Sequence, residues 1–160
     1  MNGVLSTSPA RAQDALTGTW KLVNSSTETA QRLAAIEAST QDLPSFMRSR
    51  IKERLGEKTT PPSELRIRAK GDEVELSGQG RTLRLTVGGA AVPLEMEGRR
   101  ASAQATRKNG NLVVTLQGDG GVRTNTYRLS KDGQGLVLDV EFNAQRLSTP
   151  VRYQSTYKRR

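Results

Sequence analysis

The residue types that most often carry catalysis are missing from this chain or badly placed in it. The sequence contains neither histidine nor cysteine, so it lacks the commonest general base and the thiolate nucleophile. Paired carboxylates occur at Glu73 with Glu75 and at Asp139 with Glu141. Both pairs alternate with apolar residues, which on a strand would turn the carboxylates toward solvent. We therefore expect no enzymatic activity.

Sites for metals and phosphate groups are equally poorly supported. Without thiolates or imidazoles, the usual ligands of zinc are absent. The glycine-rich stretch Gly118–Gly121 lacks the Lys-Ser/Thr pair of a phosphate-binding loop, and we interpret it as a hairpin turn. The carboxylates are too sparse in the predicted turns for a calcium loop. We expect no metal and no cofactor.

The charge of the chain points instead to anionic partners. Its formal net charge is +9, while aromatic residues make up only 4% of the sequence. Cationic proteins attract lipid headgroups, acidic polysaccharides and nucleic acids. Nucleic acid is disfavoured because few aromatic rings are present to stack on bases. A solvated basic face is the simpler interpretation, and the run from Arg48 to Arg54 and the Arg99–Arg100 pair are candidates for contacting an anionic membrane surface or polysaccharide.

Two helices are predicted between a first strand and the rest of the chain. Residues 17–24 favour a strand, and Ser25 with Glu28 then has the spacing of a capping box. A second helix is predicted from about Asp42, with Pro44 in its first turn. Apolar residues recur every four positions along it, at Leu43, Met47, Ile51 and Leu55. The helical region therefore spans about residues 26–56.

The remainder alternates between apolar and polar residues and is broken regularly by turns. Asn109-Gly110 is the strongest of these hairpin signals. Nine strands are predicted, over residues 64–70, 73–76, 83–86, 92–96, 99–108, 112–116, 122–130, 136–142 and 149–158. Alternation with a single buried face and closely spaced turns indicates a mainly β fold, a ten-stranded antiparallel meander barrel with a helix-turn-helix insert after its first strand.

The opening Thr17-Gly18-Thr19-Trp20-Lys21-Leu22-Val23 resembles the first strand of the fatty-acid-binding proteins, and Gly18-Thr19-Trp20 resembles the Gly-x-Trp opening of the wider lipocalin, or calycin, group. The order of strand, helix pair and nine strands is also similar. A more specific likeness is to uncharacterised exported lipocalin-like proteins of bacteria. It rests on residues 61–67, 80–83, 111–114, 126–130 and 150–153. This resemblance implies export and a barrel, but no reaction.

The same resemblance has two limits. Fatty-acid-binding proteins hold a carboxylate with an Arg-x-Tyr pair on the last strand, and neither Tyr153 nor Tyr157 has an arginine two residues before it. The lipocalin arginine that packs over the first-strand tryptophan has three candidates here, which are Arg152, Lys158 and Arg159.

The location of the protein is predicted from its first residues. Ala10-Arg11-Ala12 has the A-x-A pattern of a signal-peptide cleavage site. We expect residues 1–15 to be disordered, as the remnant of a signal peptide, and residues 16–160 to form a single domain. No apolar run approaches the length of a membrane span. An exported protein, periplasmic or secreted, is the expectation.

The leading functional hypothesis is binding of a small apolar or amphipathic, lipid-like ligand inside the barrel, in the bacterial envelope. Trp20 is expected to plug one end of the barrel. Residues of the helices are expected to line the entrance, namely Leu33, Phe46, Met47 and Ile51. The cavity candidates are Leu65, Ile67, Leu83, Leu85, Tyr127, Leu138, Phe142 and Tyr153. The alternative is a non-enzymatic interaction module that uses a basic surface on anionic components of the envelope.

Overall fold

The computed structural model describes residues 15–78 and 80–160 of the chain. The A-x-A pattern and almost all of the segment predicted to be disordered therefore lie outside the described residues. Within them, the alternating stretches form ten strands and the insert forms two helices, as predicted. The elements in chain order are β1 (Gly18–Leu22), α2 (Ser26–Thr40), α3 (Ser45–Lys58), β2 (Glu64–Lys70), β3 (Glu73–Gly78), β4 (Arg81–Thr86), β5 (Val92–Met96), β6 (Arg99–Lys108), β7 (Asn111–Gly118), β8 (Gly121–Leu129), β9 (Gly135–Asn143) and β10 (Val151–Arg159).

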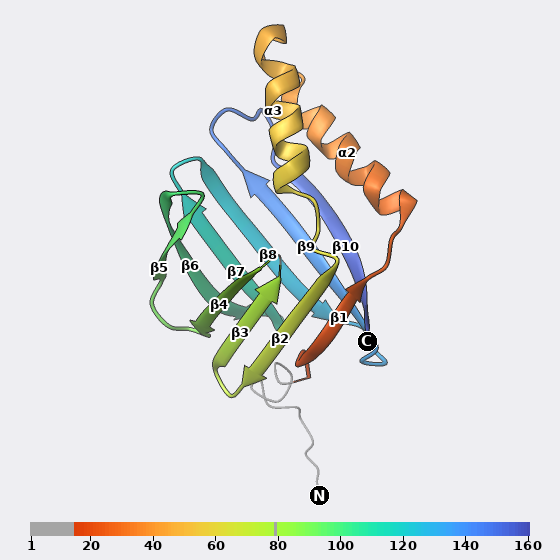
Figure 1. The fold of residues 1–160 in the computed structure, drawn as a ribbon, viewed down its shortest axis with the longest axis vertical. Helices are drawn as coiled ribbons and strands as arrows, with labels where there is room; N and C mark the ends of the chain where they lie inside the picture. The colour runs from red at the N-terminus through yellow and green to blue at the C-terminus, as the bar shows by residue number, and fades with distance from the viewer. Residues whose placement is uncertain (1–14, 79) are drawn as a thin grey trace, which may run out of the picture.

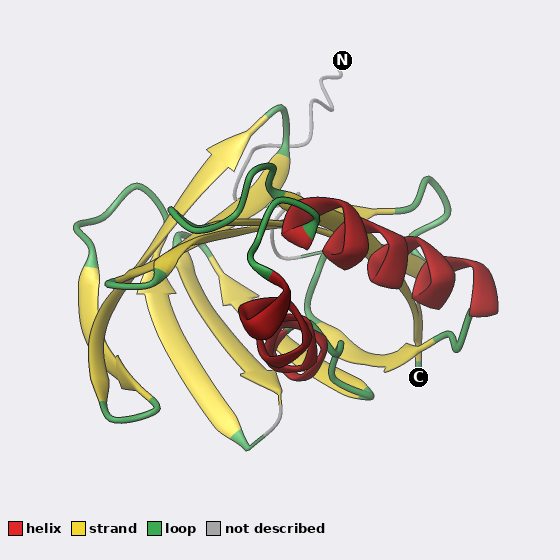
Figure 2. Cartoon of the chain, turned by 90° about the horizontal axis from the view of Figure 1, so that it is seen from above, coloured by secondary structure: helices red, strands yellow, loops and turns green. Residues whose placement is uncertain are grey.

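The strands form one antiparallel sheet that curls into a nearly closed barrel (Figures 1 and 2). Their order is β4-β3-β2-β1-β10-β9-β8-β7-β6-β5, so the first strand pairs with the last. The two ends of this order, β4 and β5, are not paired with each other. The wall meets there at one end only, where Val87 bridges to Ala105 and the Gly88 amide donates to the Ala105 carbonyl at 2.9 Å. The predicted barrel is confirmed, with this one incomplete joint.

Helix α2 runs along the part of β10 that β1 leaves uncovered (Figure 1). The Ser25 hydroxyl accepts the Glu28 amide at 3.1 Å and caps the helix, as the spacing predicts. The Glu28 carboxylate turns to β10 instead of completing a capping box. It accepts the Thr156 amide at 2.9 Å, the Thr156 hydroxyl at 2.6 Å and the Gln154 side chain at 3.1 Å. These bonds satisfy the strand edge where β1 ends.

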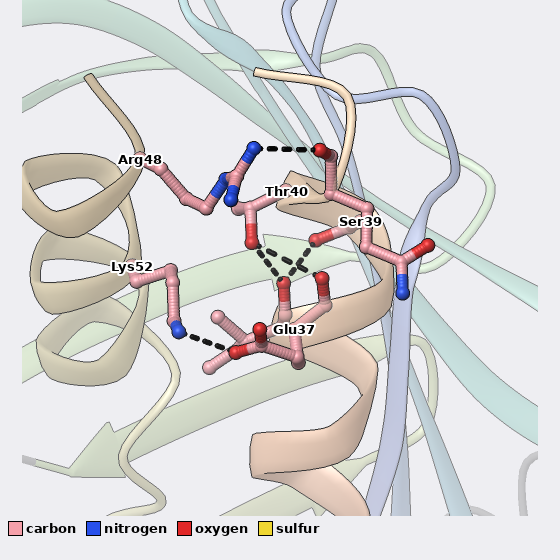
Figure 3. A network of polar contacts seen from close by, with 7 residues as sticks. Glu37, Ser39, Thr40, Arg48 and Lys52 are labelled. Carbon is pink, nitrogen blue, oxygen red and sulfur yellow. Dashed lines mark hydrogen bonds and ion pairs between the residues drawn. The ribbon is translucent and has the colours of Figure 1, made fainter. Parts of the chain in front are cut away.

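The turn between α2 and α3 is held by side chains that bond to backbone carbonyls (Figure 3). The hydroxyls of Ser39 and Thr40 both donate to the Ile36 carbonyl, at 3.0 and 2.8 Å. Arg48 of α3 donates to the carbonyls of residues 41 and 43, both at 3.0 Å, and Lys52 pairs with Glu37 of α2. Two cations of the predicted basic run are therefore used within the helical pair.

Trp20 is fully buried on β1, the strand that begins at the end of the barrel away from the helices (Figure 1). Its indole N–H donates to the Leu16 carbonyl at 2.9 Å, and the Arg159 guanidinium carbon lies 4.3 Å from the ring centroid. Of the three basic candidates, it is therefore Arg159 that covers the tryptophan. Gly18 makes room for this stack, since a Cβ there would come within 2.5 Å of the guanidinium. The Arg159 guanidinium also donates to three carbonyls, those of Ala15, Thr17 and Gly133, at 2.8 to 3.1 Å.

We expect Arg159→Met to lower the free energy of unfolding by about 2 kcal/mol, because it removes a cation–π contact together with charged hydrogen bonds. Urea unfolding followed by the fluorescence of Trp20, the single tryptophan, measures this loss. The control is Arg160→Met, which removes an exposed ion pair with Glu64 and should cost less than about 0.5 kcal/mol. Equal losses in the two variants would contradict the role given to Arg159.

Candidate ligand site at the helix-covered end of the barrel

The side chain of Arg123 on β8 faces the interior of the barrel. Tyr127 is buried and lies opposite Leu138 of β9, so the residues that alternate with it also face inward. These residues are Asn125 and Arg123, and Arg123 lies opposite Phe142 near the end covered by the helices. The adjacent strands β8 and β9 therefore place the inward-facing Arg123 beside the inward-facing ring of Phe142. They lie at the helix-covered end of the barrel, which we call the mouth.

Arg123 is held by neutral groups. Its guanidinium donates to the Asn125 side-chain oxygen at 3.1 Å, to the Lys58 carbonyl at 3.1 Å and to the Tyr153 hydroxyl at 3.4 Å. In the described part of the chain, no carboxylate lies within ion-pair distance of it. A second cation, Arg32 of α2, donates to the Thr59 hydroxyl at 2.8 Å near the same end. A guanidinium beside a phenol hydroxyl is a donor set suited to an oxyanion.

Three tyrosines complete the polar interior, and all three are buried. Burial raises the pKa of Tyr127, Tyr153 and Tyr157, while the positive charge of Arg123 opposes the increase. The Tyr157 hydroxyl donates to the Pro62 carbonyl at 2.8 Å. The phenols are therefore neutral at neutral pH; the Tyr157 hydroxyl acts as a donor, and the Tyr153 hydroxyl accepts from Arg123.

The apolar side chains of the barrel are buried to different degrees. The inward side chains of Ile67, Val74, Leu112 and Leu136 are at most 2% exposed. Others that pack against the core are only partly buried, namely Ile51, Leu83, Leu94, Leu116 and Phe142 toward the helices, and Ala69, Val87 and Leu129 toward the other end. The helix-covered end, which carries Arg123, therefore contains incompletely buried apolar side chains.

The predicted cavity residues fall into three groups. Leu65, Ile67, Leu85, Tyr127, Leu138 and Tyr153 are buried in the core, and Ile51, Leu83 and Phe142 are partly buried against it. Met47 is half-buried on α3, while Leu33 and Phe46 are 51% and 83% exposed. Phe46 lies nine residues before the buried Leu55, half a turn around α3, so it points away from the barrel. A role for these helix residues in ligand entry stays a prediction.

The sequence reasoning missed Arg123 and Asn125. It placed the cations on a solvated outer face and sought a carboxylate-binding pair only within the last strand. The structure assembles an Arg–Tyr pair from two strands, Arg123 of β8 and Tyr153 of β10. The signal was present, because Arg123 is an even number of residues from Tyr127 and Leu129 on one strand.

A hollow of about 470 Å³ lies on the outer wall and not inside the barrel. Its lining is mostly polar and comes from α2 and from strands β8, β9 and β10, with Gln31, Thr124, Thr126, Asp139, Glu141 and Arg152 among its residues. Arg152 pairs with Glu141 at 2.7 Å, which leaves this surface close to neutral. Val140 and Tyr153, whose side chains face the barrel interior, also border this hollow from the strands of the wall.

Within the described residues, no helix is long and apolar enough to cross a membrane. The same residues hold no cluster of three or more His, Cys, Asp or Glu side chains that could share a metal ion.

The buried phenols lead to a prediction about alkaline stability. A tyrosine whose pKa is raised by folding contributes stability that is complete below the ordinary phenol pKa of about 10 and is lost as pH rises past the folded value. All three tyrosines of the chain are of this kind. We expect phenolate absorbance to appear only above pH ~10 and together with loss of the near-ultraviolet circular dichroism. In denaturant, all three phenols should titrate near pH ~10. A tyrosine that also titrates near pH ~10 in the folded protein would contradict the conclusion that it is buried.

Comparisons with known proteins identify the fold. No family model matches the chain, and no curated protein matches it in sequence. A secretory abundant heat soluble protein of Ramazzottius varieornatus is similar in structure, with a TM-score of 0.59 at 14% identity, over 92% of this chain and 96% of that one. Human cRBP IV follows at 0.55 and 18%, over 91% and 98%, and fatty-acid-binding protein 1 of Echinococcus granulosus at 0.53 and 14%, over 91% and 97%. The chain has the barrel architecture of the fatty-acid-binding proteins and their calycin relatives.

Proposed function

We propose that this protein binds a small amphipathic, lipid-like molecule at the helix-covered end of its barrel. The anionic group of the ligand contacts Arg123 and the Tyr153 hydroxyl. Its apolar part lies against the partly buried inward side chains beneath the helices, such as Leu116 and Phe142. The protein acts as a binding protein and not as an enzyme.

The observation that carries this proposal is the inward charge of Arg123. Arg123 is partly buried, and a partly desolvated cation is stabilised by a counter-charge or by a full set of hydrogen bonds. Arg123 has one carbonyl, one amide oxygen and one long contact to a phenol as its partners. A ligand carboxylate would supply the missing negative charge and accept bonds from both the guanidinium and the Tyr153 hydroxyl.

The similar structures lend support through what their names state. One is described as a fatty-acid-binding protein and another as a fatty acid transporter, the latter with a TM-score of 0.56 at 15% identity. Molecules of that kind combine a carboxylate with an apolar chain, which fits the polar and apolar parts of this mouth.

We expect oleate to bind the wild-type protein more tightly than oleyl alcohol, which has the same chain without the charge. Arg123→Gln should weaken oleate binding by about tenfold or more, because a charged hydrogen bond contributes about 1.5–3 kcal/mol, and should leave the alcohol nearly unaffected. Tyr153→Phe should weaken oleate binding by a smaller factor. Displacement of a fluorescent fatty-acid probe measures all three affinities.

The matched control for this experiment is Arg152→Gln. Arg152 lies on β10 beside Tyr153, but it faces outward and pairs with Glu141, so the substitution removes the same charge from the outside of the wall. Its oleate affinity should match that of the wild type. The proposal is wrong if neither probe binds, if acid and alcohol bind equally, or if Arg152→Gln and Arg123→Gln lose the same affinity.

We further propose a location in the bacterial envelope, periplasmic or secreted. The support is the A-x-A pattern at residues 10–12 and the resemblance to exported lipocalin-like proteins. Fractionation of producing cells tests it, and a protein that remains wholly in the cytoplasm with its first residues uncleaved would contradict it.

A further inference from the structure

The outer wall of the barrel divides into a paired and an unpaired part. On the wall formed by β8, β9 and upper β10, Arg128 bonds to Asp139 at 2.6 Å and Arg152 bonds to Glu141 at 2.7 Å. Cations and carboxylates there alternate across the strands and offset one another. The excess of positive charge must therefore be displayed elsewhere on the molecule.

A large share of the excess positive charge lies where the first strand, β1, pairs with the last strand, β10. Five exposed cations occupy the outer face of β1, β2 and the end of β10, and we call them the seam patch: Lys21, Arg66, Arg68, Lys158 and Arg160. Glu64 lies among them and bonds to both Arg66 and Arg160, at 3.3 and 2.5 Å. Glu75 of the neighbouring β3 lies opposite Arg68 but bonds to Arg84 at 2.9 Å. Strands β1, β2 and β10 lie side by side in Figure 1.

The centre of the seam patch carries two like charges directly opposite each other. Lys21 of β1 and Lys158 of β10 are register partners, and both side chains are exposed on the outer face. Like charges in this arrangement destabilise a sheet. Glu64 is the register partner of Lys21 on the other side, but no ion pair of 4 Å or less joins them, and its oxygens accept from the two arginines. The charge of both lysines is left for solvent or for a bound anion.

The seam patch lacks the features that favour other anionic partners. Of the exposed large apolar residues among those described, only Val23 lies beside the patch, two residues after Lys21, and it is 38% exposed, so the patch offers little apolar surface to insert into a lipid layer. It also contains no aromatic ring on which a nucleobase could stack. What it offers is an array of cations, about 4.8 Å apart across strands and about 7 Å apart along them.

We propose that the seam patch binds a linear acidic polysaccharide, whose hydrated carboxylates contact several of these cations at once. This site is on the opposite side of the barrel wall from Arg123. It is independent of any ligand inside the barrel, and its test does not depend on that of the proposed function.

The test uses immobilised alginate, a linear polyuronate, with neutral dextran as the uncharged counterpart. We expect the wild-type protein to bind alginate, to release it as salt rises and to ignore dextran. Lys21→Gln combined with Lys158→Gln should reduce alginate affinity at low salt by about tenfold and flatten its salt dependence, since two charge contacts are lost. The matched control is Arg81→Gln with Lys108→Gln, which removes two exposed charges outside the patch and should change affinity by less than about twofold.

Thermal unfolding gives a second readout that loss of folding could not imitate. Without alginate, the Lys21/Lys158 double variant should melt slightly above the wild type, because the opposed charges are gone. With alginate, the wild type should gain more in melting temperature than the double variant.

Several results would overturn the proposal. One is equal loss of alginate affinity in the patch variant and in the control, which would mean that net charge alone is responsible. Another is undiminished alginate binding by the patch variant. A third is patch-dependent binding to vesicles containing phosphatidylglycerol that is tighter than binding to alginate, which would make a membrane the partner.

Discussion

Pairing between β1 and β10 joins the first strand to the last, and the shortness of that pairing determines where the helices lie. Only three rows join the two strands, and each row has its own consequence: Trp20 with Arg159, Lys21 with Lys158 and Leu22 with Tyr157. Beyond the last row, the Val23 amide donates to the Thr156 carbonyl at 2.8 Å, and β10 then continues without β1. The remaining backbone donors and acceptors at this edge must be satisfied in another way. Helix α2 does this through Glu28, which accepts the Thr156 amide and hydroxyl. The short first strand therefore decides where the helices lie and which end of the barrel they cover.

The two ends of the barrel then take different chemistry, although each contains an inward arginine. Arg159 at one end stacks on Trp20 and donates to three carbonyls, so its charge is well solvated by the protein. Arg123 at the covered end has three uncharged acceptors at 3.1 to 3.4 Å, and partly buried apolar side chains lie near it. The first arrangement suits a structural plug. The second leaves a cation in a position where a ligand group can complete its shell, which is why we assign binding to that end.

Local patterns were enough to predict the number and kind of the elements. Alternation and turn residues identified the ten strands, and the Ser25–Glu28 spacing identified the start of α2. The assumption that cations face solvent was the main source of error, because it hid Arg123 and left three candidates for the partner of Trp20. Strand parity resolves both cases, since Arg123 shares a face with Tyr127 and Arg159 shares one with Tyr157. Phe46 was predicted to flank the regular stripe, and half a helical turn separates it from Leu55, so its role in ligand entry stays a prediction.

Contacts between distant strands lie beyond any such local pattern. The opposition of Lys21 and Lys158 depends on the register between the first strand and the last, and no feature near either residue encodes it. That opposition lies in the middle row of the pairing that joins the first strand to the last, between the row that holds Trp20 and the row next to the helices. A like-charge pair at this position weakens that pairing. A polyanion bound across the seam patch would contact both Lys21 and Lys158, so their mutual repulsion would be replaced by attraction of each lysine to the same polyanion. On this proposal, the opposed pair Lys21 and Lys158 is both the least favourable contact of the barrel wall and the centre of its polysaccharide site. Binding of the polysaccharide therefore strengthens the pairing between β1 and β10.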